Sequence, residues 1–185
     1  ALIYAQLGDN EKAMEAVKLA RKEDPKDLNL ILTEANLYIQ LKESDRFEDL
    51  MKEAITQDPN NATLYFNLGV VNAQNGNSEE AKSYYKKTIE LDPNLESGYL
   101  NLVSLILEGE SSIVEEMNGL GTSRADNARY DELKETRENL YKECVPILEK
   151  LVEINKNQEA ISTLMNIYGT LGNNDGFKRM KELVE

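Results

Sequence analysis

The sequence predicts an all-α protein, a right-handed superhelical solenoid of antiparallel helix pairs with one extended helical hairpin. Asp-Pro dipeptides end at Pro25, Pro59 and Pro93, so they recur every 34 residues. Between them, small and apolar residues return at helical spacing. The interval from Pro93 to the next equivalent position, Lys156, is nearly twice as long, which predicts one enlarged repeat. A fixed period of this length is typical of stacked helical hairpins rather than of one globule.

Each repeat is predicted to hold two short antiparallel helices, with a proline where the second helix must stop. A turn position, where glycine permits positive φ, stands at the same distance before each proline and holds Gly8, Lys42 and Gly76. A small residue, where two helices approach closely, precedes each proline by five positions: Ala20, Ala54 and Thr88. Tyr65 and Tyr99, also 34 residues apart, each begin a first helix.

This spacing divides the chain into a single array of repeats. We expect a partial repeat at 1–27, full repeats at 28–61 and 62–95, an enlarged repeat at 96–157 and a C-terminal repeat at 158–185. Ala1 enters the pattern in the middle of a first helix and there is no initiator Met. We therefore expect a fragment of a longer array, with an unknown number of repeats before it.

The residues that recur resemble those of the tetratricopeptide repeat proteins. The fullest set lies in one repeat: Tyr65, Leu68, Gly69, Gly76, Ala81, Tyr85 and Pro93. A second set lies near the start: Tyr4, Gly8, Ala13, Val17, Ala20 and Pro25. The resemblance covers 1–103 clearly and 144–185 less completely. The chain is also similar to a bacterial subgroup with an elongated hairpin, which implies the bacterial cell envelope or periplasm, with the cytoplasm as the alternative.

The enlarged repeat is predicted to be a pair of helices that both run long. An apolar stripe marks the first helix: Leu102, Leu105, Ile106, Ile113, Val114 and Met117. A facing stripe marks the second: Tyr130, Leu133, Leu140, Tyr141, Cys144, Ile147, Leu148 and Leu151. At the tip, residues 119–127, we expect Gly119 or Gly121 to end the first helix. Ser123, Asp126 or Asn127 would cap the second.

Two features of this hairpin leave alternatives open. Pro146 lies inside the second helix and removes one backbone donor, so it predicts a kink or, alternatively, a hinge for a moving arm. The tip is either a capped turn between helices or a docking loop.

Composition excludes several classes of function. With 34 acidic and 21 basic residues the net charge is −13, which argues against binding to nucleic acid or to an anionic membrane surface. No apolar run approaches the ~18 residues that a membrane span needs, so we expect no membrane insertion. A basic or neutral polypeptide partner is compatible with this charge.

The chemistry of common active sites is missing from the sequence. There is no His, and the one Cys, Cys144, falls on the predicted helix seam, which predicts a packed thiol. No glycine-rich phosphate loop followed by Lys and Ser or Thr occurs. We therefore predict a protein that is not an enzyme, with no catalytic residues, no metal site and no cofactor.

The resemblance implies that partners lie as peptides on the first helices of successive repeats. The candidate side chains are carboxamides in two sets: Gln6, Gln40 and Gln74 every 34 residues, and Asn36, Asn67 and Asn101. A carboxamide offers a donor and an acceptor to a peptide backbone. The alternative is that these are ordinary polar residues on a solvated helix face.

A chaperone-tail adaptor is not expected. In the tetratricopeptide groove that grips the carboxylate of a chaperone tail, two asparagines act together with several cations. Asn36 and Asn67 match the asparagines, whereas Ser97 and Asn101 stand in the cation positions. Without those cations, the charge-assisted bonds that make such a site selective are missing.

The sequence thus predicts a scaffold or adaptor for protein segments, with the long hairpin as a second contact. The alternative is a structural module for self-association or for packing within a larger protein. A third possibility is an array that regulates an enzyme elsewhere in its chain. The partner is a protein or peptide whose identity the sequence does not give.

Overall fold

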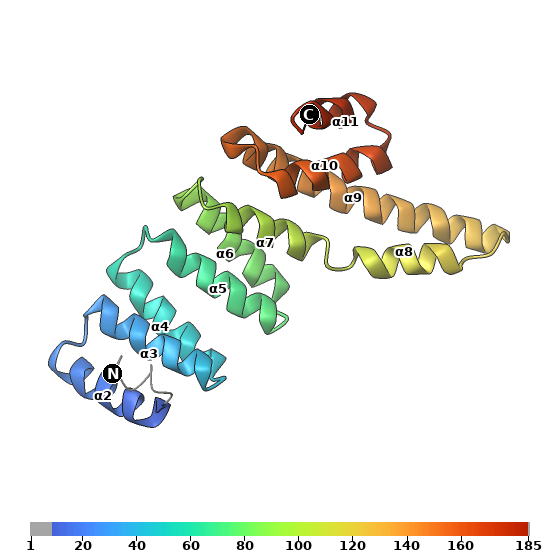
Figure 1. The fold of residues 1–185 in the computed structure, drawn as a ribbon. Coiled ribbons are helices and arrows are strands. Elements are labelled where there is room, and N and C mark those ends of the chain that lie inside the picture. Colours follow the sequence, from blue (N-terminus) through green and yellow to red (C-terminus); the bar gives the residue numbers. More distant parts are fainter. Residues whose placement is uncertain (1–8, 185) are drawn as a thin grey trace. The chain divides into compact units, whose positions relative to one another are not determined.

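The computed structural model describes residues 9–184, and every regular element in this range is an α-helix (Figure 1). The chain divides into two compact units, 1–93 and 94–185. Most helices pack as hairpins with the next helix in the chain, such as α3 with α4, α5 with α6 and α10 with α11, so the predicted all-helical solenoid architecture is confirmed.

The first unit holds five described helices. They are α2 (Asn10–Glu23), α3 (Leu28–Gln40), α4 (Ser44–Gln57), α5 (Ala62–Gln74) and α6 (Ser78–Leu91). Helices α3 and α4 form one hairpin and α5 and α6 the next.

The Asp-Pro dipeptides end helices as predicted. Asp24, Asp58 and Asp92 are the C-caps of α2, α4 and α6, each with φ between −135 and −132°. A following proline excludes the helical region for the residue before it, so each aspartate takes an extended conformation. Its N–H still bonds to the carbonyl four residues back, which belongs to the predicted small residue: Ala20, Ala54 or Thr88.

The turns inside the hairpins also follow the prediction. Gly76 has φ of 79° and joins α5 to α6. In the preceding repeat Lys42 takes φ of 60° at the same position, a left-handed conformation that costs a residue with Cβ more than it costs glycine. Gly8 lies outside the described residues.

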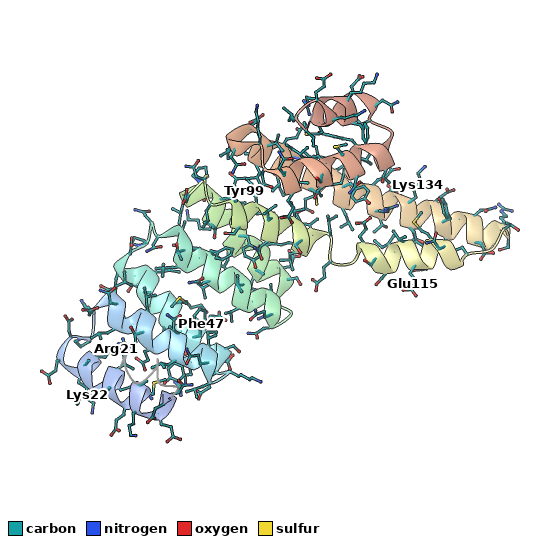
Figure 2. The ribbon with its side chains drawn as sticks, in the orientation of Figure 1. Arg21, Lys22, Phe47, Tyr99, Glu115 and Lys134 are labelled. Carbon is teal, nitrogen blue, oxygen red and sulfur yellow. The ribbon has the colours of Figure 1, made fainter. Side chains whose placement is uncertain are left out.

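The core of the first unit runs through α3, α4 and α5. It is an apolar cluster made of Ile31, Ala35, Phe47, Leu50, Met51, Ala54, Leu64, Leu68 and Val71. Phe47, labelled in Figure 2, occupies a position where the neighbouring repeats have alanine, and it is buried. A smaller cluster joins α2 to α3 through Ala13, Met14, Val17 and Leu37.

Helices α2, α3 and α4 are also joined by an ion triad. The Arg21 guanidinium lies 2.7 Å from a Glu34 carboxylate oxygen and 2.5 Å from one of Glu53. Glu34 is only 7% exposed. Because a buried carboxylate without its cation is costly, Arg21 fixes the three helices against one another.

The α5–α6 hairpin is packed closely at a glycine. A Cβ placed on Gly69 would lie 2.6 Å from the Tyr85 ring, so the ring packs directly on the backbone of α5. The rings of Phe66 and Tyr85 are 5.9 Å apart between centroids. The turn after α5 is held by Asn72, whose amide donates to the Leu68 carbonyl and accepts from Asn77.

The second unit also holds five described helices. They are α7 (Glu96–Ile106), α8 (Glu110–Gly119), α9 (Arg124–Asn155), α10 (Gln158–Leu171) and α11 (Asn174–Lys181). Helix α9 packs against α7, α8 and α10, and α10 packs against α11.

The prediction that both helices of the enlarged repeat run long is wrong for the first of them. The chain breaks its helix at 107–109, so α7 and α8 are separate. At the break, the Glu108 and Glu110 N–H groups bond to carbonyls three residues back rather than four. Glycine destabilises a helix when it lies in the interior, and here Gly109 is the N-cap of α8. Helix α9 is continuous over 32 residues and runs through Pro146.

The apolar stripes face each other only in part. In the second stripe Leu133, Tyr141, Cys144, Leu148 and Leu151 are buried, as predicted. Leu140 and Ile147 are half-buried, and Tyr130 is 44% exposed, so these three lie at the edge of the seam or outside it. In the first stripe Ile113, Val114 and Met117 are half-buried, and no residue of α8 is buried.

Polar side chains hold α8 to α9. Glu110 accepts hydrogen bonds from Arg137, at 2.8 and 2.9 Å, and from the Tyr141 hydroxyl. Nearer the tip Glu116 accepts two from Arg129, at 2.7 and 3.1 Å, and these bonds lower the pKa of Glu116. We refer to these two groups as the base clip (Glu110, Arg137, Tyr141) and the tip clip (Glu116, Arg129).

The tip has a capped turn between the two helices, and the caps lie at residues that the sequence predicted for them. Helix α8 ends at Gly119, and the Ser123 hydroxyl accepts from the Asp126 N–H at the start of α9. The Asp126 carboxylate accepts from the Ser123 N–H, which completes a capping box. Side chains such as Glu115 on α8 and Lys134 on α9 are exposed along the hairpin (Figure 2).

Candidate functional site

The predicted carboxamides of the first unit lie on its first helices. Asn36 and Gln40 are exposed on α3, where Gln40 is the last residue. Gln74 is exposed at the end of α5, and Asn67 is half-buried near the middle of that helix. None of the four side chains has a hydrogen bond within residues 9–184, so their donors and acceptors are open to solvent.

The remaining two candidates differ from these four. Gln6 lies outside the described residues. Asn101 is half-buried on α7, in the second unit, and its amide donates to the Ser97 carbonyl at 2.9 Å. One donor of Asn101 is therefore used by its own helix, and the site prediction as a whole stays a prediction.

The second unit has a hollow on the side where α7 and α10 both meet α9. Its volume is about 390 Å³. The residues around it are Leu100, Val103, Ser104, Leu107, Glu108 and Ser111, with Leu148, Glu159 and Thr163. Val103 and Leu148 are buried, whereas the two glutamates are exposed. We call it the α7–α10 hollow.

Glu108 was missed by the sequence analysis, although a signal for it was present. It follows Gln74 by 34 residues and so continues the series Gln6, Gln40 and Gln74. The carboxamides themselves end at Gln74, because position 108 holds a glutamate. In the enlarged repeat the same position carries a carboxylate, which accepts hydrogen bonds but cannot donate them.

A clamp at one end of α7 holds the walls of the hollow together. Glu96, the first residue of α7, accepts from the Asn155 amide and from the Asn157 amide, each at 2.6 Å. Asn155 ends α9, and Asn157 caps α10. Because one carboxylate binds both, α7 is tied to the turn that starts α10.

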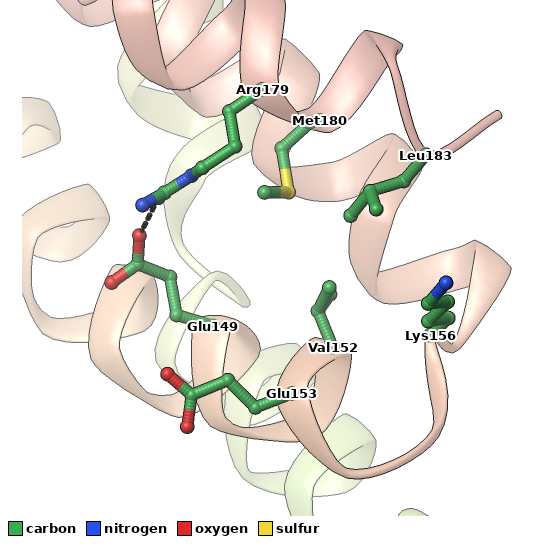
Figure 3. Close-up of a pocket in the computed structure, with 7 residues that line it drawn as sticks. All are labelled: Glu149, Val152, Glu153, Lys156, Arg179, Met180 and Leu183. Atoms are coloured by element: carbon green, nitrogen blue, oxygen red, sulfur yellow. Dashed lines mark hydrogen bonds and ion pairs between the residues drawn. The ribbon is translucent and has the colours of Figure 1, made fainter. Parts of the chain in front are cut away.

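A second hollow of about 330 Å³ lies near the end of the second unit, between α9 and α11 (Figure 3). Its apolar wall is formed by Val152, Met180 and Leu183. Three of the four charged residues at its edge are in ion pairs. Glu149 pairs with Arg179 across it, as Figure 3 shows, and Glu153 lies 3.7 Å from Lys150.

The Glu149 carboxylate also accepts from the Tyr168 hydroxyl, at 2.5 Å. Burial and this hydrogen bond raise the pKa of Tyr168 to about 12. Gly176 of α11 lies against the Tyr168 ring, where a Cβ would come within 2.9 Å of it. These contacts fix the α10–α11 hairpin on α9 and leave few polar groups for a ligand.

Two further observations concern the described residues only. Among residues 9–184 no group of three or more His, Cys, Asp or Glu is placed to hold a metal ion. In the same range no helix has the length and apolar character that a bilayer crossing requires. Cys144 is buried, which confirms the predicted packed thiol.

Two segments of the chain match the sequence models of a known protein family. Residues 62–95 and residues 1–27 each match a model described as the tetratricopeptide repeat. The chain therefore contains tetratricopeptide repeats, as the recurring residues implied.

Solved structures with the same fold cover nearly the whole chain. A crystal structure of MamA is 19% identical, with a TM-score of 0.60, over 97% of this chain and 91% of the other. A MamA RS-1 double mutant is 12% identical, with a TM-score of 0.64, over 99% and 87%. The first repeat domain of Spaghetti (RPAP3), bound to an HSP90 peptide, is 24% identical, with a TM-score of 0.50, over 55% and 81%. No curated protein matches this chain. The likenesses show the fold.

Proposed function

We propose that this protein is a non-enzymatic scaffold or adaptor that binds polypeptide segments along its first helices. The main support for the proposal is a set of carboxamide side chains without hydrogen-bond partners among the described residues: Asn36, Gln40, Asn67 and Gln74. They recur on α3 and α5, and their hydrogen-bonding groups have no partner among the described residues. Such groups can pair with the backbone of an extended peptide with little regard for its side chains.

A solved relative supports the same class of function. The first repeat domain of RPAP3 has a similar fold and was solved with a peptide of HSP90, SRMEEVD, bound to it. That peptide is acidic. This chain has a net charge of −13 and carries Ser97 and Asn101 where cations would grip a terminal carboxylate, so we propose a neutral or basic segment instead.

The test is an array of immobilised peptides that varies residue type at each position. Replacing Gln40 and Gln74 by glutamate removes both amide donors and adds two charges at exposed positions. Capture of uncharged peptides should fall, while the helical signal and the melting temperature change little. Gln57→Glu is the control for each single replacement, since it adds one charge to an exposed position at the end of α4.

Two results would contradict the proposal. Unchanged capture by the double variant would mean that the carboxamides are ordinary surface residues. If no peptide is captured and the chain forms oligomers that grow with concentration, self-association replaces peptide binding as the function.

A further inference from the structure

The α7–α10 hollow carries two carboxylates that nothing within the described chain neutralises. Glu108 and Glu159 are exposed at its edge, and neither carboxylate has an ion pair or accepts a hydrogen bond from any residue of 9–184. Other glutamates of the same unit are bound: Glu96 by two amides, Glu110 by Arg137, and Glu149 by Arg179. The hollow thus presents uncompensated negative charge.

Between these carboxylates the lining combines four aliphatic side chains with the hydroxyls of Ser104, Ser111 and Thr163. Val103 and Leu148 are buried beneath it, and Leu100 and Leu107 are half-buried on its α7 side. Burial of an aliphatic side chain here would remove apolar surface from water on both partners, which is the main favourable term in such contacts. The Ser104 and Ser111 hydroxyls at the rim can bond to the backbone on either side of that side chain.

We propose that the α7–α10 hollow binds a polypeptide segment in which an aliphatic side chain is flanked by lysine or arginine. The aliphatic group occupies the space over Val103 and Leu148, and the flanking cations pair with Glu108 and Glu159. The proposal rests on the proposed function and specifies the chemistry of the partner at this end of the array. An acidic segment is excluded from this hollow because its charges would repel both carboxylates.

The register of the repeats supports this assignment independently of the hollow. Glu108 stands where the earlier repeats have Gln40 and Gln74. All three positions therefore carry a hydrogen-bond acceptor, and only the one in the second unit is negatively charged. Glu108, just after α7, therefore offers a charged acceptor where α3 and α5 of the first unit offer neutral ones.

The experiment measures binding of three fluorescein-labelled peptides that share one Gly-Ser framework and have blocked ends. The first carries a leucine flanked by lysines, the second a leucine flanked by glutamates, and the third a serine flanked by lysines. Fluorescence anisotropy is recorded at low and at physiological salt. The first peptide should bind most tightly, and its affinity should fall as salt rises.

Variants locate the contact. Glu108→Gln and Glu159→Gln should each weaken binding of the lysine-flanked leucine peptide by about two- to fivefold, the range expected for solvent-accessible ion pairs. Glu135→Gln is the control, because Glu135 is an exposed glutamate of α9 outside the hollow. Amide NMR shifts on binding should centre on Ser104, Ser111 and Thr163.

The outcomes separate this inference from the proposed function. Equal affinity for the glutamate-flanked peptide, equal weakening by Glu135→Gln, or no binding of the lysine-flanked leucine peptide would overturn the inference. Binding that is lost on Gln40→Glu/Gln74→Glu, but not on Glu108→Gln or Glu159→Gln, would overturn it while the proposed function stands. If both sets of variants leave peptide binding unchanged, both proposals fail.

Discussion

Two helical hairpins of this chain are built in different ways. In the α5–α6 hairpin, Tyr85 packs on the bare backbone at Gly69, and apolar side chains fill the remaining space. In the α8–α9 hairpin, α8 has no buried residue and is held to α9 by the base clip and the tip clip. The two helices of the repeat hairpin are therefore held together by close packing of complementary surfaces. Those of the extended hairpin are held together by ion pairs beside a thin apolar seam.

The largest difference between the two regions should appear when one apolar side chain is removed from each. Leu68→Ala should lower the free energy of unfolding by about 2–5 kcal/mol, because Leu68 is fully buried in the core of the first unit. Ile113→Ala, on half-buried α8, should cost about 1 kcal/mol or less. Urea denaturation measures both. Equal losses would mean that α8 packs as tightly as a repeat helix.

A second prediction concerns alkaline pH in the second unit. Burial and Glu149 raise the pKa of Tyr168 to about 12, above its unfolded value of about 10. A raised pKa adds stability that is fully present below pH ~10 and is lost as the pH rises toward ~12, since the unfolded tyrosine ionises first. The loss is about 2–3 kcal/mol.

The measurement is the difference in unfolding free energy between wild type and Tyr168→Phe from pH ~9 to pH ~12. The difference should shrink over this range, because phenylalanine has no proton to lose. A difference that does not change with pH would contradict the assignment.

A third prediction sharpens the role of shape in the α5–α6 hairpin. Gly69→Ala places a Cβ against the Tyr85 ring and should destabilise the fold by about 1–3 kcal/mol. Gly109→Ala is the matched change in the second unit, where nothing lies within 4 Å of the added atom. There the stability should stay the same or rise by up to about 1 kcal/mol. Thermal unfolding of the two variants decides between these outcomes.

The smallest effect is expected at the base clip. Glu110→Gln removes the charge that Arg137 binds, and α8 should open more easily by about 1 kcal/mol. Hydrogen exchange should then be about fivefold faster for the amides of α8, with no change in α5 or α6. Glu115→Gln, an exposed position on the same helix, is the control. Equal exchange in both variants would show that the apolar seam alone holds α8.

Much of the fold was predictable because it depends on local signals that repeat. Helices end at Asp24, Asp58 and Asp92 because the next residue is proline. The turn at Gly76 requires a positive φ, which glycine adopts easily. The capping box of Ser123 and Asp126 is likewise a matter of residues three apart.

The features that were not predictable depend on how two helices meet. Apolar residues keep helical spacing from Leu102 to Met117, so the sequence pattern shows no break at 107–109. The break is decided by the cost of Gly109 and by the base clip, which binds α8 to residues 27 and 31 positions away. The α7–α10 hollow was missed for the same reason, although the register already placed Glu108 in line with Gln74.

The independence of α8 from the buried core has a consequence for how this protein can diverge. No side chain of α8 is buried. Whole helical turns could therefore be lost or gained together in α8 and in the facing part of α9. Such a change would alter the length of the hairpin and leave the interior of the repeats unchanged. Apart from Leu133, the buried residues of α9 lie nearer its C-terminal end, from Tyr141 to Val152. Selection can therefore lengthen, shorten or redecorate the hairpin among descendants while the repeats around it keep their residues.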